Sequence, residues 1–143
     1  MSESPVGLIE RFFAAINEGV ARGEDVDEIV ARVADWVDPQ LEYVNPPDAI
    51  EGGTRHGLEG LVTVAKNSRE AGIHRWEASD VTAEGDSVAC RVRLYMVGTS
   101  SGAETQRESS VLATIRDWRI TKLEWFLDPD EAHTRLAPAG ESR

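Results

Sequence analysis

The sequence has few of the residues on which many protein classes depend. Its 143 residues include one cysteine, Cys90, which excludes an intramolecular disulfide and any metal site built from several cysteines. No apolar run reaches the roughly 18 residues of a membrane-spanning helix, and the opening residues lack the pattern of a secretory signal. No phosphate-binding glycine loop or nucleophile motif is present. These absences predict a cytoplasmic domain without membrane contact or covalent catalysis.

Basic residues are also scarce. Lysine and arginine total 15 against 26 acidic residues, which gives a formal net charge of −11. Such a surface repels phosphate backbones, so we expect no nucleic-acid partner. The three histidines lack metal-ligand spacing, and we therefore predict neither a metal nor another cofactor.

What is present indicates one folded domain over residues 1–143. Hydrophobic residues make up 41% and charged residues 29%, proportions typical of a globular chain. The length is close to that of a single domain, and it suffices for a core with an internal pocket.

The first half of the chain has helical periodicity. Ser4 and Pro5 are suited to begin a first helix, which we expect to end at Gly19. Asp25 and Glu28 predict a capping box, and apolar spacing then extends a second helix to about Val37, before Pro39. We predict a strand over 41–45, a loop through the glycines that follow, and a third helix over 57–71.

From residue 74 the apolar period changes from helical to two. We predict antiparallel strands over 74–83, 87–97, 104–116 and 119–127, because the connections between them are short. A short helix is expected after Asp128. Helices followed by a strand meander predict an α+β fold in which a curved, mainly antiparallel sheet wraps the first helix.

Several runs of residues carry a resemblance to a known family. They are FFAAINEG (12–19), YVNPP (43–47), GLEGL (57–61), GDSV (85–88), RDWRITKLEWFLD (116–128) and DEA (130–132). With these runs the chain resembles the SnoaL-like family of the nuclear transport factor 2-like superfamily, over about residues 6–137. The resemblance implies a cone-shaped, cystatin-like α+β barrel with a pocket for a small hydrophobic molecule. It also implies a homodimer formed through the outer face of the sheet.

The catalytic residues of the family are incompletely matched. Ketosteroid isomerases have an aspartate base where this chain has Asn45, and an amide cannot abstract a proton from carbon. The aspartate in the last strand of polyketide cyclases and epoxide hydrolases falls at Trp125. Tyr43 and Asn45 match the tyrosine and asparagine of limonene epoxide hydrolases in spacing, whereas the Arg-x-Asp motif of those enzymes appears only as Arg91-Val92-Arg93.

Tyr43 and Asn45 share one face of the predicted strand, because they alternate with Glu42 and Val44. If that face lines the pocket, a phenol and an amide can orient a carbonyl, an epoxide or a water. The alternative is a packed core aromatic and a turn-forming asparagine.

Arg91 and Arg93 also share a face, and inside a pocket they would bind an anion. The opposite face of their strand is the cleaner apolar one, which favours arginines at the solvent or dimer surface. Glu124 is expected to point away from the apolar side, and Asp128 to cap the last helix.

His56 follows the glycine-rich loop, with Asp48 and Glu51 nearby in the sequence. A histidine beside carboxylates can transfer protons near neutral pH, although a solvated loop histidine is the simpler explanation.

We therefore predict a pocket lined by Phe13, Ile16, Tyr43, Asn45, Leu123 and Trp125. If the protein is an enzyme, the resemblance implies cofactor-independent cyclase, isomerase or hydrolase chemistry, with Tyr43, Asn45 and His56 as the catalytic candidates. The alternatives are a dimeric binding protein without catalysis and an accessory dimerisation module whose pocket is filled by side chains.

Overall fold

The structure is a computed structural model that describes residues 4–46, 52–98 and 101–136. Its elements in chain order are α1 (Pro5–Ala21), α2 (Val26–Val33), the 3₁₀ turn η1 (Ala34–Trp36), β1 (Val37–Asn45), β2 (Gly53–His56), α3 (Gly57–Glu70), β3 (Ile73–Glu84), β4 (Ser87–Val97), β5 (Glu104–Arg116), β6 (Arg119–Phe126) and α4 (Glu131–Arg135).

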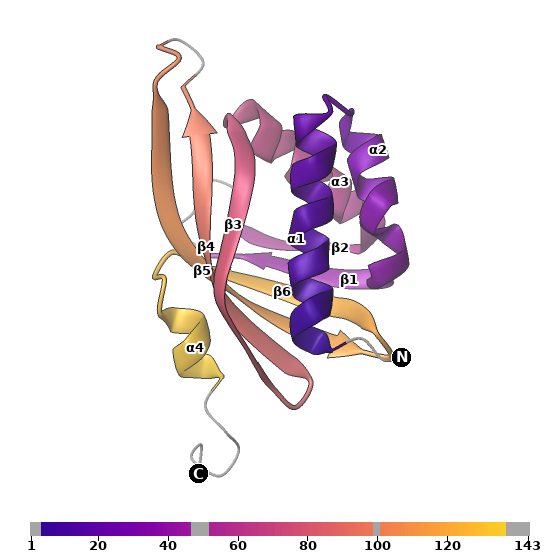
Figure 1. Cartoon of the computed structure of the whole chain (residues 1–143). Coiled ribbons are helices and arrows are strands. Elements are labelled where there is room, and N and C mark those ends of the chain that lie inside the picture. The colour runs from indigo at the N-terminus through magenta and orange to yellow at the C-terminus, as the bar shows by residue number, and fades with distance from the viewer. Residues whose placement is uncertain (1–3, 47–51, 99–100, 137–143) are drawn as a thin grey trace.

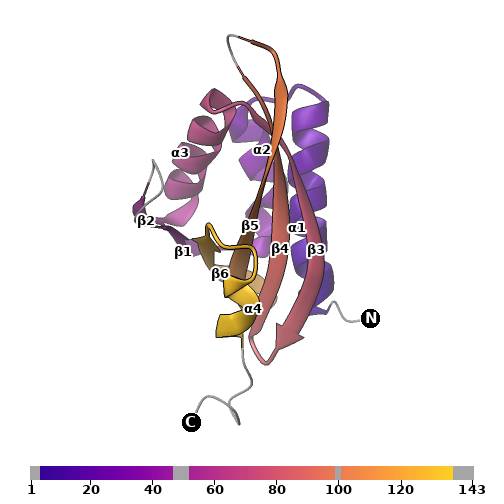
Figure 2. The same ribbon diagram turned by 90° about the vertical axis from the view of Figure 1, so that its left-hand side faces the viewer.

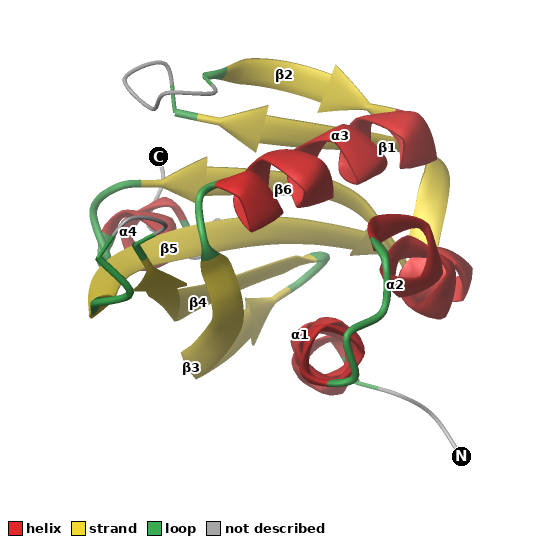
Figure 3. Cartoon of the chain, turned by 90° about the horizontal axis from the view of Figure 1, so that it is seen from above, coloured by secondary structure: helices red, strands yellow, loops and turns green. Residues whose placement is uncertain are grey.

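Within the described residues, six strands form one sheet in the order β2-β1-β6-β5-β4-β3 (Figure 1). Strands β1 and β6 are parallel, and every other neighbouring pair is antiparallel. Viewed from above, the sheet curves around the side on which α1, α2 and α3 lie (Figure 3). This arrangement confirms the predicted α+β fold with a curved, mainly antiparallel sheet.

The first two helices begin where their capping residues predict. The Ser4 hydroxyl accepts a hydrogen bond from the Gly7 N–H at 2.9 Å, one residue before α1 begins at Pro5. Asp25 and Glu28 form the predicted capping box, each carboxylate accepting the backbone N–H of the other residue.

The predicted end of α1 at Gly19 is wrong, because the helix continues to Ala21. Gly19 is buried where α2 crosses α1, and a Cβ at this position would lie 2.7 Å from Cγ1 of Ile29. The glycine therefore permits close contact between two helices.

Helix α2 is shorter than predicted, and β1 begins earlier. The helix ends at Val33, and after η1 the strand begins at Val37 and includes Pro39. The pairing of β1 with β6 shifts register between Val37 and Glu42, so Pro39 lies in an irregular stretch where its missing N–H costs no regular ladder bond. The predicted loop after β1 contains a further short strand, β2, which pairs antiparallel with β1.

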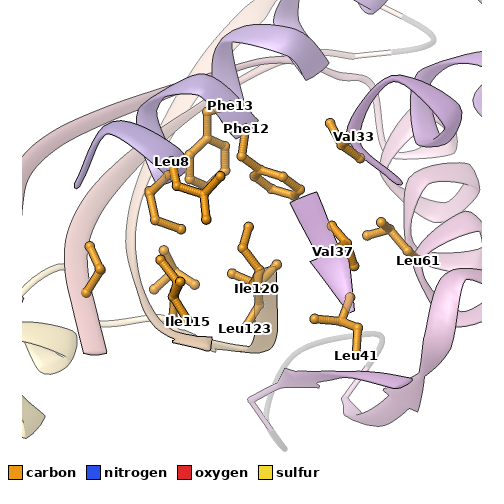
Figure 4. Close-up of a cluster of buried hydrophobic side chains, with 14 of the residues drawn as sticks. Leu8, Phe12, Phe13, Val33, Val37, Leu41, Leu61, Ile115, Ile120 and Leu123 are labelled. Atoms are coloured by element: carbon orange, nitrogen blue, oxygen red, sulfur yellow. The ribbon is translucent and has the colours of Figure 1, made fainter. Parts of the chain in front are cut away.

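The main hydrophobic core lies between α1 and the inner face of the sheet. Figure 4 shows Phe12 and Phe13 of α1 above Ile120 and Leu123 of β6. Alternate residues of β4 complete this core: Val88, Cys90 and Val92 are all fully buried.

Helix α4 packs on the opposite, outer face of the sheet (Figure 2). Ala132 of α4 and Leu136, which follows the helix, pack in a small cluster with Ala89 of β4. The prediction that Asp128 caps this helix is wrong, because the N-cap is Asp130 and the helix begins at Glu131. The Asp128 carboxylate instead accepts the Asp130 N–H at 2.8 Å and closes the preceding turn.

Candidate functional site

A cavity of about 290 Å³ lies between the three N-terminal helices and the inner face of the sheet. Most of its wall is aliphatic or aromatic. The lining side chains from the helices include Phe12, Phe13, Ile16, Val20, Val30, Leu61 and Ala65, and those from the sheet include Tyr43, Trp76, Leu123 and Trp125.

A second cavity, of about 200 Å³, adjoins the first. The two share Tyr43, Ser68, Trp76 and Trp125 among their lining residues. The second cavity is the more polar of the two, because its wall adds Asn45, Asn67, Arg107 and Ser109. Together the cavities offer an apolar chamber beside a chamber with hydrogen-bonding groups.

The pairing of β1 with β6 brings Tyr43 and Trp125 together. Tyr43 lies opposite Leu123, and Trp125 follows two residues later on the same face of β6. Burial raises the pKa of the Tyr43 phenol well above its ordinary value, and the Trp125 indole N–H, which acts on the phenol, lowers it in part. The phenol therefore keeps its proton at neutral pH and is a hydrogen-bond donor, not a base.

The contact between these two side chains falls short of a full hydrogen bond. Nε1 of Trp125 is buried and has no hydrogen-bond partner in the described part of the chain. An unpaired buried donor costs free energy.

The structure places the other predicted pocket residues as follows. Phe13, Ile16 and Leu123 line the first cavity together with Tyr43 and Trp125, whereas Asn45 lines the second.

His56 lies apart from this group. It is exposed at the end of β2, opposite Glu42 of β1, and it lines neither cavity. Asp48 and Glu51 lie outside the described residues.

Arg91 and Arg93 lie on the outer face of β4, opposite the buried apolar positions of the same strand. Arg91 forms an ion pair with Asp130, and Nη2 of Arg93 lies 2.7 Å from Oε2 of Glu108. Glu124 also avoids both cavities, and its carboxylate lies 3.9 Å from Nζ of Lys122.

Two basic residues that the sequence analysis did not single out line the cavities. Arg69 of α3 lines the first cavity, and its Nη2 donates to the backbone oxygen of Glu24 at 2.6 Å. Arg107 of β5 lines the second. Arg107 precedes Ser109 by two residues and Val111 by four, so it lies on the same, inner face of β5 as they do. This alternation was visible in the sequence.

His74 was likewise not among the predicted site residues. It stands near the start of β3, lines the first cavity, and has Nε2 3.1 Å from Oε2 of Glu104. Nothing in its sequence neighbourhood distinguishes it from a surface histidine.

Carboxylates are absent from both cavity walls, as far as the described residues go. The described residues also contain no group of three or more histidine, cysteine, aspartate or glutamate side chains that could hold a metal ion. None of the helices in the described part is both long and apolar enough to cross a bilayer.

Three helices over the concave face of a curved six-stranded sheet, enclosing an apolar cavity, define the cystatin-like or nuclear transport factor 2-like class of α+β domains. Within that class the chain belongs to the SnoaL-like domain family, whose model matches residues 9–123.

Solved structures share this fold at low sequence identity. TerC, co-crystallised with polyporic acid, is 20% identical with a TM-score of 0.67, over 93% of this chain and 98% of its own. A putative SnoaL-like polyketide cyclase from Jannaschia sp. CCS1 is 18% identical with a TM-score of 0.65, over 96% and 97%. SalBIII, an epoxide hydrolase/cyclase-like enzyme of pyran ring formation in salinomycin, is 18% identical with a TM-score of 0.64, over 83% and 86%. The comparison with curated protein sequences gave no match.

Proposed function

We propose that this SnoaL-like domain binds a small, mainly apolar organic molecule in its two adjoining cavities. The observation that carries the proposal is the first cavity, which has a mainly apolar wall and one partly buried phenol, Tyr43, whose pKa burial raises. An apolar pocket with a few placed polar groups is the usual form of a small-molecule site.

In this proposal Tyr43 donates a hydrogen bond to an oxygen of the ligand, and Asn45 orients the same part of the molecule from the second cavity. If the ligand is a substrate, the chemistry is a cofactor-free proton transfer that accompanies cyclisation, isomerisation or hydrolysis. His56 lies outside both cavities, and the imidazole of His74, whose residue borders the first cavity, lies against Glu104 and Tyr95, so we assign the proton transfer to neither histidine.

The structural neighbours support this type of ligand. TerC was crystallised with polyporic acid, and SalBIII is described as epoxide hydrolase/cyclase-like. At 18–20% identity these proteins share the fold with our chain, and their activities support our proposal only by analogy.

The second candidate function is ligand binding without catalysis. It is favoured by the absence of carboxylates from the described cavity walls and by Trp125, which stands where related cyclases have an acid. An accessory dimerisation module, the third possibility, is disfavoured by the open volume of the two cavities.

Filling the first cavity tests the proposal. Ala65→Phe introduces a ring into the cavity, and Ala14→Phe, at an exposed position of the neighbouring helix α1, is its matched control. We expect the wild-type protein and Ala14→Phe to bind the probe 2-acetylnaphthalene by isothermal titration calorimetry, and Ala65→Phe to bind it at least tenfold more weakly. Equal affinity in all three proteins would place the probe elsewhere and remove the support for this site.

Truncating the polar contacts distinguishes an enzyme from a binding protein. With a turned-over substrate in hand, Tyr43→Phe and Asn45→Ala in an enzyme lower kcat more than they weaken binding. In a binding protein the two variants change only the dissociation constant.

We also propose a homodimer that forms through the outer face of the sheet. Helix α4 covers the part of this face around Ala89, which leaves the area around Arg93 and Tyr95 available. Sedimentation equilibrium should give twice the chain mass for the wild type and a weaker dimer for Arg93→Glu. A monomer at high concentration would exclude the dimer.

A further inference from the structure

We propose that the ligand carries a carboxylate, which Arg107 binds at the second cavity while the apolar body of the ligand occupies the first. This inference rests on the proposed function and names the chemical class of the molecule bound.

Charge is distributed unevenly between the cavity walls and the rest of the molecule. The chain has 26 acidic residues and a net charge of −11, yet none of the described residues that line either cavity is an aspartate or glutamate. The permanently charged side chains in the two walls are Arg69 and Arg107, both cationic. A carboxylate that enters the cavities therefore meets attraction there, in a molecule whose remaining surface repels it.

Arg107 has no hydrogen-bond or ion-pair partner among the described residues. Arg69 is held by the backbone oxygen of Glu24. Among the described residues, by contrast, no carboxylate lies within 4.0 Å of the Arg107 guanidinium, and no acceptor forms a hydrogen bond with it. Arg91 and Arg93, two strand arginines of the outer face, are each paired with carboxylates. Arg107 thus retains its full hydrogen-bonding capacity for a ligand.

Arg107 also lies beside the apolar wall of the second cavity. It pairs in register with Leu94 of β4, and both residues line the second cavity together with Trp76 and Trp125. These two tryptophans also line the first cavity. A flat ring system can therefore lie against them with its acidic group directed to the Arg107 fork, whose geometry matches a carboxylate.

A pair of probes with the same ring and different charge tests the inference. We would measure binding of 2-naphthoate and of the neutral 2-acetylnaphthalene by isothermal titration calorimetry. The wild type is expected to bind the carboxylate about tenfold more tightly, at the lower end of what hydrogen bonds to a charged group contribute. Arg107→Gln should bind both probes equally, and Arg107→Lys should keep part of the preference.

Arg119→Gln is the matched control. Arg119 is exposed on β6, has no ion pair to a described residue, and lines neither cavity, so its loss makes the same change in net charge. We expect it to keep the wild-type preference. Circular dichroism of each variant establishes that it is folded, which is expected because both arginines are exposed.

The outcomes separate the two proposals. If the wild type binds neither probe, the proposed function is overturned and the inference with it. If the wild type binds both probes equally, only the inference is overturned. A preference for naphthoate that survives in Arg107→Gln, or that disappears in Arg119→Gln, also contradicts the role of Arg107.

Discussion

The two faces of strands β4 and β5 differ in whether their arginines are paired with carboxylates. On the outer face, Arg91 is paired with Asp130 and Asp80, and Arg93 is paired with Glu108 and Glu77, so each of these arginines has carboxylate partners. On the inner face the strands are apolar through the core, and their one described arginine, Arg107, is unpaired where it meets the second cavity. One alternating pattern thus places arginines with carboxylate partners on the outer face, and on the inner face an arginine without a partner among the described residues.

The difference shows that net charge alone describes this protein poorly. A value of −11 predicts repulsion of every anion. The acids, however, are absent from the described cavity walls, and the permanently charged side chains there are Arg69 and Arg107.

The largest loss of stability is expected from a substitution on the inner face of the sheet. Leu123 is fully buried between the core and the first cavity, and Leu123→Ala should lower the free energy of unfolding by about 2–5 kcal/mol. Leu127, half exposed just after β6, is the control, and Leu127→Ala should cost about 0.5 kcal/mol or less. Urea unfolding measures both. Equal losses in the free energy of unfolding would mean that the cavity wall rearranges to fill the space left by the Leu123 side chain.

Substitutions of Ser109 and Ser110, which are adjacent on β5, compare the inner and outer faces of the sheet directly. The buried Ser110 hydroxyl donates to the Asp128 oxygen at 2.7 Å and accepts the Ala132 N–H at 3.2 Å, which fixes α4 to the outer face. Ser110→Ala leaves both groups unpaired and should cost about 1–3 kcal/mol. Ser109 of the inner face makes one bond, to the Val92 oxygen at 3.0 Å, and Ser109→Ala should cost less in the same urea titration. The reverse order would show that α4 contributes little to the fold.

Alkaline pH tests the protonated phenol. Burial raises the pKa of the Tyr43 phenol in the folded protein above the value of about 10 that it has in the unfolded chain. The neutral phenol therefore contributes its full stability to the fold below about pH 10, and this contribution is lost as the pH rises above that value. Between pH 8 and pH 10.5 the wild type should lose roughly 1 kcal/mol more stability than Tyr43→Phe. Burial also raises the pKa of Cys90, to about 12, but this thiol is common to both proteins and its contribution cancels. Parallel losses in the two proteins would place the phenol in contact with water.

The smallest effect is expected at the outer ion pairs. Arg93 and Glu108 are both exposed, and solvent screens their attraction. Arg93→Ala should leave the urea midpoint of the dilute protein almost unchanged. A large loss of stability at low concentration would indicate that this face is covered, as it would be in a tight dimer.

The sequence allowed much of the fold to be predicted, because its signals are local. Capping at Ser4 and Asp25 located two helix starts, and alternation located β3 to β6 to within a few residues. The short strand β2 and the early start of β1 were missed because they depend on pairing with distant strands, which leaves no local period.

The walls of the cavities were predictable from the sequence only in their apolar part. Tyr43, Leu123 and Trp125 lie on alternating strand positions whose inner face is set by hydrophobicity, and all three line the first cavity. His56 and Arg107 illustrate the limit. Whether a polar residue lines a cavity depends on the tertiary packing around it, which the local sequence does not reveal. His56, which was chosen for its chemistry, lines neither cavity, whereas Arg107, which was not singled out, lines the second.

The most direct test of this account is a crystal structure of the protein soaked with 2-naphthoate. We expect the ring between Trp76 and Trp125, within the two cavities, and the carboxylate oxygens within hydrogen-bond distance of the Arg107 guanidinium. Naphthoate bound on the outer face, or inside the cavities with its carboxylate directed away from Arg107, would contradict the account.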